Sequence, residues 1–269
     1  RYVLFDGNLT NHQIAAEGFR IKALEFEFEA VKQKVMYDAI ISYLNVLRDT
    51  KLVELSKKNV SFLRQQLDAT ISRFDLGELT RTDVAQSKAA LEAATSILAS
   101  REGILYVSSN AFEIAVGIRP VELDAELSLP PLPKHEEDAK SAAVKLNMEL
   151  KACKMYVIRA QSALEASKAK SWPTLNVSTS LNGGETGSKQ DFSNFGFSLM
   201  GSLPLYKGGG LESGERRAAS DLELSTVNAH IARLTVEQAV VTAWSDYTVS
   251  SAVISARTRE VEATQLAYE

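Results

Sequence analysis

The sequence predicts a mainly α-helical fold with a smaller β part, in which a long antiparallel coiled-coil hairpin precedes a pair of short strands. Three observations predict this fold class. Apolar residues recur at every seventh position up to a short glycine-containing turn, they recur at the same interval after it, and a later stretch alternates apolar with small polar residues. A seven-residue period is typical of coiled-coil helices, and a two-residue period is typical of strands.

The predicted hairpin consists of two long helices that meet at the turn. A seven-residue apolar period keeps one seam on one side of a helix only if the helices supercoil left-handedly. The first arm, from about Ile21 to Phe74, would be roughly 80 Å long at about 1.5 Å per residue, which is more than a core of this size requires. The ladders are Ala39, Val46, Val53, Val60, Leu67 and Phe74 before the turn, and Val84, Leu91, Leu98, Leu105 and Phe112 after it. Mostly small residues follow three positions after each member of the second ladder: Ser87, Ala94, Arg101, Ser108 and Ala115.

The turn itself predicts a well-defined tip. Gly77 can supply the positive φ that ends the first helix, and Thr80 or Thr82 can cap the second, with Asp83 in its first turn. This interpretation leaves two leucines unexplained, because an apolar residue at the exposed end of a rod has little core to enter. The candidate tip residues are Leu76, Gly77, Glu78, Leu79, Thr80 and Arg81.

We expect two domains, at residues 1–126 and 127–269. The first contains a strand end and the hairpin. The second contains a proline-rich linker, a helix from about Glu136 to Lys170, two strands at about 174–206, and the first helix of a second hairpin. Trp172-Pro173 ends the shorter helix, because a residue before proline avoids the helical region.

The two strands have one apolar and one small polar face. The first alternates at Leu175, Val177, Thr179 and Leu181, and the second at Phe195, Phe197, Leu199, Gly201, Leu203 and Leu205. We expect a polar loop from Asn182 to Asp191 between them. Strands of about nine to eleven residues match the length that crosses an outer membrane in a β-barrel. Taken alone, this pattern fits a soluble hairpin on a core better, because alternating strands are common.

An internal repeat shifts the balance toward the barrel. Leu4-Phe5-Asp6-Gly7 reappears as Leu205-Tyr206-Lys207-Gly208, and a long helix follows both times. A repeated unit of strand, glycine and long helical hairpin is an unusual architecture. The chain looks cut at both ends, so that the last helix lacks its tip and return arm, and the missing targeting segment says nothing about the parent protein.

Composition excludes several functions. A net charge of −4 without a basic stretch argues against nucleic acid, and the sequence has no run of eighteen apolar residues for a membrane helix. Cys153 stands alone and the three histidines are dispersed, so we expect no disulfide, no metal and no cofactor. The carboxylates on the helices look like a solvated face, with no catalytic pair, and we expect no enzyme.

The residues resemble the TolC-like family of outer-membrane efflux and type I secretion proteins. The resemblance covers essentially the whole chain, in the family's order, beginning after the family's first helix and strand and ending before its second hairpin tip. Met148 departs from the pattern, because the family usually has proline there. The motifs are Tyr43-Leu44-Asn45-Val46-Leu47, the stretch from Arg73 to Val84, Ser171-Trp172-Pro173-Thr174-Leu175, and Leu203-Pro204-Leu205-Tyr206-Lys207-Gly208-Gly209.

The resemblance implies a trimeric α/β-barrel tunnel in the bacterial outer membrane. Four strands per protomer would form a shared twelve-stranded transmembrane β-barrel, and the helices would continue across the periplasm. The tip, Leu76 to Arg81, would dock a periplasmic adaptor, through which an inner-membrane transporter would recruit the channel. Trp172, Phe192 and Tyr206 would lie at the interface with outer-membrane lipid. The family's gate belongs to the second hairpin, so no gating residue is assigned, and neither the exported substrate nor the pump's energy source is indicated.

An alternative from another class is a periplasmic adaptor or a soluble coiled-coil scaffold, which would also present a helical hairpin. The alternating strands and the repeat of strand and helix argue against it, because an adaptor typically has one hairpin inserted in small β domains.

Overall fold

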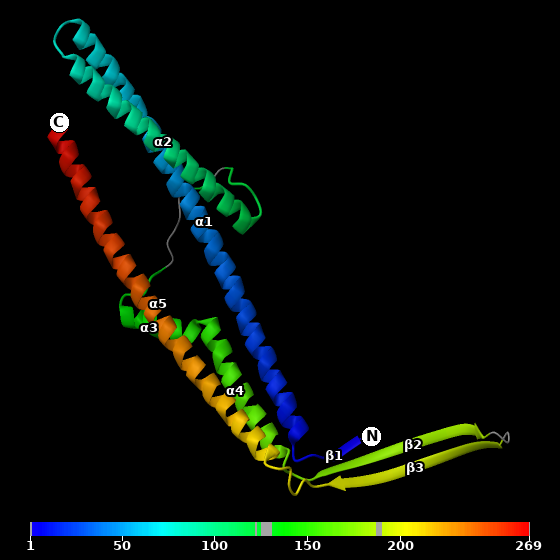
Figure 1. Cartoon of the computed structure of the whole chain (residues 1–269). Helices are drawn as coiled ribbons and strands as arrows, with labels where there is room; N and C mark the ends of the chain where they lie inside the picture. The colour runs from blue at the N-terminus through cyan, green and yellow to red at the C-terminus, as the bar shows by residue number, and fades with distance from the viewer. Residues whose placement is uncertain (1, 122, 125–130, 187–189, 269) are drawn as a thin grey trace. The chain divides into compact units, whose positions relative to one another are not determined.

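The computed structural model describes residues 2–121, 123–124, 131–186 and 190–268, and the side chains of 185, 186, 190–192, 267 and 268 lie outside the description. The described residues form five helices and three strands, with four helices in succession between the first strand and the other two (Figure 1). Their order is β1 (Tyr2–Phe5), α1 (Leu9–Asp75), α2 (Arg81–Val116), α3 (Glu136–Leu146), α4 (Met148–Ala169), β2 (Thr174–Thr186), β3 (Gln190–Ser202) and α5 (Gly210–Tyr268). Among the described helices, none has the length and apolarity that a membrane span requires.

The chain divides into two compact units. One comprises Arg1–Ala30 and Leu132–Glu269, and the other comprises Val31–Pro131. Helix α1 begins in the first unit and ends in the second. Residues 125–130, where the sequence predicts the domain boundary at 126/127, lie outside the described residues, so that boundary stays a prediction.

The second unit is the predicted antiparallel hairpin of α1 and α2. Every member of the two apolar ladders is buried or half-buried, and Val46, Val53 and Phe112 are buried. Across the seam, the rings of Tyr43 and Phe112 lie 6.3 Å apart between centroids. Helix α1 begins at Leu9, before the expected start near Ile21, because the Asp6 carboxylate accepts hydrogen bonds from the backbone N–H and the hydroxyl of Thr10.

The seam contains a second row of residues on α1 that the apolar pattern does not predict. The row repeats every seven residues and consists of Ser42, Asp49, Ser56, Leu63 and Thr70. Ser42 and Asp49 are buried, and the other three are half-buried. This row faces the predicted small residues of α2: the hydroxyls of Thr70 and Ser87 lie 3.2 Å apart, and Ser108 is near enough to Asp49 to lower the pKa of its carboxyl. One side of the hairpin seam is therefore apolar and the other is small and polar.

In the first unit, the prediction of a single helix from Glu136 to Lys170 is wrong, because Asn147 separates two helices, α3 and α4. The Asn147 backbone adopts φ −59° and ψ 123°, and its side-chain oxygen accepts a hydrogen bond of 2.8 Å from the Leu150 N–H. An asparagine cap ends one helix and begins the next without proline or glycine. Both α3 and α4 pack against α5, and α4 buries Leu150, Ala152, Ala166 and Ala169.

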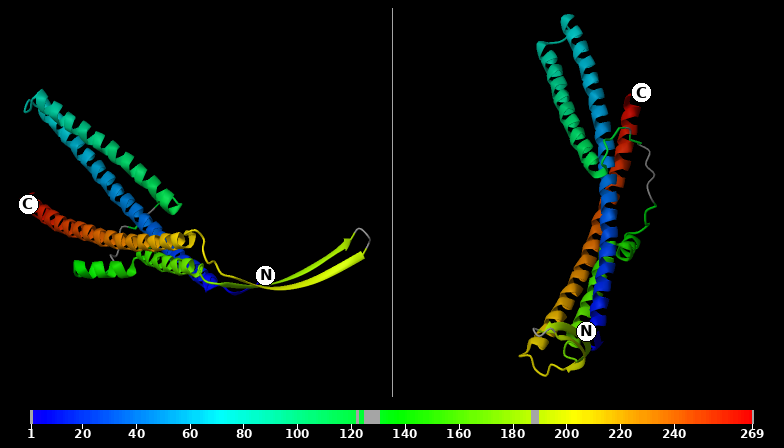
Figure 2. Two further views of the ribbon diagram at one scale, coloured as in Figure 1. Left: turned by 60° about the horizontal axis from the view of Figure 1, so that its bottom comes forward. Right: turned by 90° about the vertical axis from the view of Figure 1, so that its right-hand side faces the viewer.

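The three strands form an antiparallel sheet in the order β1-β2-β3. Figure 2 shows β2 and β3 as a long curved ribbon. Each strand is 13 residues long. The prediction of a loop from Asn182 to Asp191 is therefore wrong at both ends, because the strands include Asn182 to Thr186 and Gln190 to Asp191. The polar, glycine-rich sequence resembles a loop, yet its backbone pairs across the hairpin, as Gly184 does with Phe192.

The internal repeat has a matching backbone. Gly7 and Asn8 have φ of 66° and 67°, and Gly208 and Gly209 have φ of 60° and 79°, with a long helix beginning directly afterwards in both cases. A left-handed pair turns the chain from the sheet into the helix at both places. The preceding strand differs, because β1 includes Phe5 whereas β3 ends at Ser202.

Candidate hairpin tip and apolar sheet face

Helix α1 ends at the tip in a glycine-dependent motif. Gly77 has φ 80°, its N–H donates to the Phe74 carbonyl at 2.9 Å, and the Glu78 N–H donates to the Arg73 carbonyl at 3.0 Å. These two bonds form a Schellman motif, in which a left-handed residue satisfies the last carbonyls of a helix. The side chains of Arg73 and Glu78 form an ion pair at 3.0 Å across the turn.

Helix α2 begins in a capping box. Of the two candidate caps, Thr80 is the one used: its hydroxyl accepts from the Asp83 N–H at 3.4 Å, and its own N–H donates to the Asp83 carboxylate at 2.7 Å. The backbone hydrogen bond from Thr80 lowers the pKa of the Asp83 carboxyl, which therefore stays ionised near the positive end of the helix. The tip is held at both ends, so its shape is fixed.

The tip presents one large apolar side chain. Leu76 is 76 % exposed, whereas Leu79 is half-buried against the hairpin. Glu78, Thr80 and Arg81 are exposed around Leu76. The exposed side chains of the tip offer a surface for contact with another protein. Any docking role for Leu76, Gly77, Glu78, Leu79, Thr80 and Arg81 stays a prediction.

The sheet has one apolar and one polar face, as the alternation predicts. On the apolar face, Leu181 pairs with Phe195 and Val177 pairs with Leu199, and Phe195 is 70 % exposed. On the other face, the hydroxyls of Ser178 and Ser198 lie 2.8 Å apart, and the remaining cross-strand pairs are mostly small or polar. So large an exposed apolar face requires a partner surface or lipid.

Two of the three predicted interface aromatics lie where the sheet meets the helices. Trp172, 57 % exposed, follows α4 and packs on Gly7, where a Cβ atom would lie 2.6 Å from the Trp172 Cβ. Tyr206, 83 % exposed, precedes α5. The backbone of Phe192 lies near the opposite end of β3, and its side chain is outside the described residues. Their membrane role stays a prediction.

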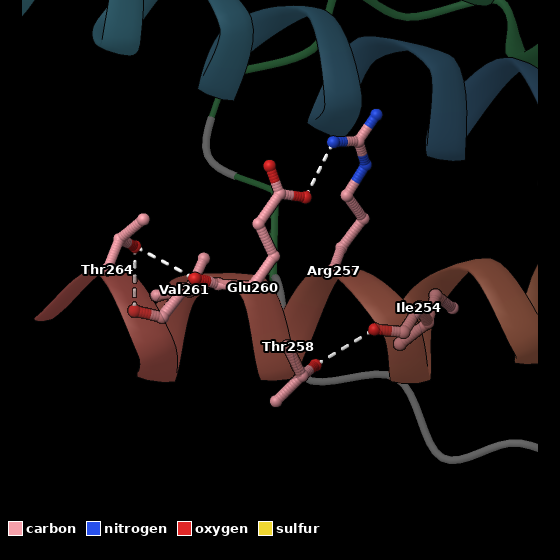
Figure 3. A network of polar contacts seen from close by, with 6 residues as sticks. All are labelled: Ile254, Arg257, Thr258, Glu260, Val261 and Thr264. Carbon is pink, nitrogen blue, oxygen red and sulfur yellow. Dashed lines mark hydrogen bonds and ion pairs between the residues drawn. The ribbon is translucent and has the colours of Figure 1, made fainter. Parts of the chain in front are cut away.

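Catalytic features are not evident in the described part of the chain. Burial raises the pKa of the Cys153 thiol, which disfavours the reactive thiolate. Among the described residues, no group of three or more His, Cys, Asp or Glu side chains could hold a metal ion. Polar groups near the end of α5 interact within that helix: Figure 3 shows the ion pair of Arg257 with Glu260, 2.7 Å long, and Thr264 donating to the Glu260 carbonyl at 2.9 Å.

Comparison with known proteins agrees with this architecture. Residues 140–269 match the outer membrane efflux protein family. The outer membrane efflux protein BepC of Brucella suis biovar 1 (strain 1330) is 26 % identical over 270 residues, covering 99 % of this chain and 59 % of BepC. The outer membrane protein TolC of Escherichia coli (strain K12) is 24 % identical over 258 residues, covering 88 % of this chain and 52 % of TolC.

The crystal structure of CusC, described in terms of folding and transmembrane channel formation, superposes with a TM-score of 0.83. The match covers 98 % of this chain and 63 % of CusC at 16 % sequence identity, which is evidence for a shared fold. The chain spans about half to three-fifths of the length of the curated relatives that it matches. The comparisons confirm the predicted fold class of long helices with a small sheet.

Proposed function

We propose that this chain, whose residues 140–269 match the outer membrane efflux protein family, forms part of an outer-membrane exit duct that extends into the periplasm. In this role it serves a tripartite efflux pump or a type I secretion system, and it catalyses no reaction of its own. The export energy comes from an inner-membrane transporter, and a periplasmic adaptor links the two.

The exposed apolar face of the sheet carries this proposal. Leu181, Phe195 and Leu199 face the lipid, while Ser178 and Ser198 face a polar lumen. This division between faces is what a strand in a membrane barrel requires, because lipid-facing and lumen-facing residues alternate along it. The remaining strands come from further segments and from other copies of the chain.

Exposed apolar rows on the helices support a homotrimer. In α1, Ile14, Ile21 and Phe28 recur every seventh residue and are exposed. In α5, the exposed Leu224 and Ile231 show the same interval. Rows of this kind are the seams through which helices of neighbouring protomers pack.

The tip supports adaptor docking, because Leu76 is exposed on a turn whose shape is fixed. Leu76→Asp in the full-length protein should therefore abolish export while the amount of trimer in the outer membrane stays normal. Leu55→Asp is the matched control, since Leu55 is a similarly exposed leucine on the shaft of α1. Normal export by the tip variant would contradict the docking role.

The membrane role is tested with adjacent positions on β3. Leu199→Arg places a charge on the lipid face, where arginine costs about 2–4 kcal/mol at mid-bilayer depth. Ser198→Arg places the same charge on the opposite face. Outer-membrane fractions of the parent bacterium should contain little full-length Leu199→Arg protein and near-normal amounts of Ser198→Arg protein. Equal amounts of the two variants would refute the assignment of the faces.

A further inference from the structure

The apolar face of the sheet contains a groove at the end where the strands join the helices. Its volume is about 450 Å³, and its lining includes Phe5, Pro173, Leu175, Gly201 and Leu203. We call it the rim groove. The volume lies within the roughly 300–1,000 Å³ of small-molecule sites, and the lining side chains are mostly apolar.

Gly201 creates the space. It pairs with Leu175 across the sheet, and a Cβ atom at Gly201 would meet the Leu175 Cδ1 at 3.9 Å, an ordinary contact distance. A side chain would therefore fit, and the glycine leaves a gap beside Leu175 on the apolar face. Phe5 borders the gap after an irregularity in the pairing between Val3 and Phe5, which changes the direction of the strand end.

The rim groove lies at the level where the sheet gives way to charged helices. Trp172 precedes the lining residue Pro173, and Tyr206 follows Leu203 by three positions. Both aromatic side chains are exposed, as amphipathic rings are at a membrane–water interface. In the proposed orientation, this level is the head-group region of the periplasmic leaflet.

The charges at this level suit a phosphate. Lys207 is exposed and directly follows Tyr206, and Lys170 is exposed two positions before Trp172. The nearby Asp6 carboxylate is occupied, because it accepts hydrogen bonds from the N–H and the hydroxyl of Thr10 at the start of α1. Lysine side chains on apolar surfaces extend their ammonium groups to the head-group level.

We propose that the rim groove binds one acyl chain of a glycerophospholipid of the periplasmic leaflet, with the lipid phosphate at the level of Lys207 and Lys170. This inference rests on the proposed function, because it requires the sheet to face lipid. The occupant is a phospholipid chain because the groove lining is mostly apolar, the groove opens on the proposed lipid face, and exposed lysine and aromatic residues adjoin its lining in sequence.

The test uses the full-length protein reconstituted in vesicles of phosphatidylethanolamine and phosphatidylglycerol that contain a phospholipid with a photoreactive diazirine on its acyl chain. After irradiation, mass spectrometry of peptides locates the labels. We expect labelling at Phe5 and Leu203 to exceed that at Leu181 and Phe195 at least fivefold per residue. Equal labelling along the apolar face would overturn the rim groove while leaving the membrane-facing sheet intact.

Variants that fill or spare the rim groove test whether the groove causes the excess labelling at Phe5 and Leu203. Gly201→Leu fills it without backbone strain and should reduce the groove labels at least fivefold, whereas Thr179→Leu adds the same side chain elsewhere on that face and should not. Lys207→Gln should reduce them about two- to fivefold, as expected for an exposed ion pair. If Gly201→Leu does not assemble, Leu203→Trp blocks the groove from its edge. Unchanged labels in an assembled blocked variant would overturn the proposal.

The remaining outcomes separate this inference from the proposed function. A complete absence of labels on β2 and β3 would contradict both, because the sheet would then not face lipid. If a neighbouring protomer, held in place by an engineered disulfide, shields the rim groove from labelling, the proposal of a bound phospholipid is overturned and the membrane-facing sheet is not.

Discussion

Asp49 offers the sharpest test of how the hairpin is held together. Its side chain is only 3 % exposed, and it accepts hydrogen bonds from Arg48 at 2.8 Å and 3.1 Å. On the opposite helix, Ser108, whose hydroxyl donates to the Leu105 carbonyl at 3.1 Å, is near enough to lower the pKa of the Asp49 carboxyl as well. These interactions hold the pKa of the Asp49 carboxyl below its ordinary value, with Arg48 the largest cause. We predict that Asp49→Ala loosens α2 from α1 near this position.

The magnitude follows from the partners. Hydrogen bonds to charged groups contribute about 1.5–3 kcal/mol. The larger penalty of a stranded buried charge does not apply to Arg48, because its side chain is 59 % exposed and can return to water. We therefore expect Asp49→Ala to lower the local opening free energy by about 1.5–3 kcal/mol, which corresponds to roughly 10- to 150-fold faster amide exchange.

The assay is amide hydrogen exchange in the full-length protein, followed in peptides that contain Ser108. Peptides of β2 and β3 serve as the internal reference. Asp49→Leu is the comparison variant, because a packed apolar side chain can replace a buried charge at little loss of stability, and we expect exchange within about tenfold of wild type. Exchange in Asp49→Ala within twofold of wild type would refute the reasoning, as would equal acceleration in the Leu and Ala variants.

Three further predictions concern pH, the cap and the left-handed turn. Because the folded-state pKa of Asp49 is lowered, the stability that its carboxylate contributes is complete above the unfolded pKa of about 3.9 and is lost as pH falls through the folded pKa. The protection of α2 amides from exchange, corrected for intrinsic exchange rates, should therefore be constant from pH 7 to about 5 and fall at lower pH. Asp49→Asn should lack this loss of protection in acid. Thr80→Ala should destabilise the first turn of α2 by about 1 kcal/mol, which corresponds to roughly fivefold faster amide exchange there. An equal effect of Thr82→Ala would contradict the assignment of Thr80 as the cap. Gly7→Ala should lower the yield of assembled trimer, since it combines φ 66° with a clash against Trp172; a normal yield would disprove the close approach.

The seam shows what the sequence pattern could and could not predict. The apolar ladder was predictable because Val46, Val53 and their equivalents repeat at seven residues and enter the core. The row of Ser42 and Asp49 has the same period, but a search for apolar residues does not detect polar ones. A buried aspartate cannot be predicted from the sequence until the positions of its hydrogen-bonding neighbours are known. A search for any residue type repeating at seven positions beside the ladder could have found it.

Other differences have local causes. The break at Asn147 has no proline or glycine in this chain to signal it, and an asparagine can equally lie within a helix. The proline that the TolC-like family usually has at position 148 is the indication of a helix start there. Glycine-rich strand ends near Gly184 look like a loop because only cross-strand pairing stabilises them. Of the candidate sites, the tip was predictable because Gly77 and Thr80 are adjacent in sequence, whereas the rim groove requires the register that brings Gly201 opposite Leu175.

The geometry of the tip also bears on how docking would work in the proposed trimer. Because the Schellman motif and the capping box fix the turn before any partner arrives, binding loses little conformational entropy there. Leu76 is, however, the single large apolar side chain that the tip exposes prominently, and one such contact falls well below the area of a stable interface. Three tips on one trimer make the second and third contacts intramolecular, which raises the overall affinity without new contacts. Docking should therefore be weak for an isolated hairpin and strong for the assembled trimer, so that export depends steeply on an intact Leu76 in all three copies.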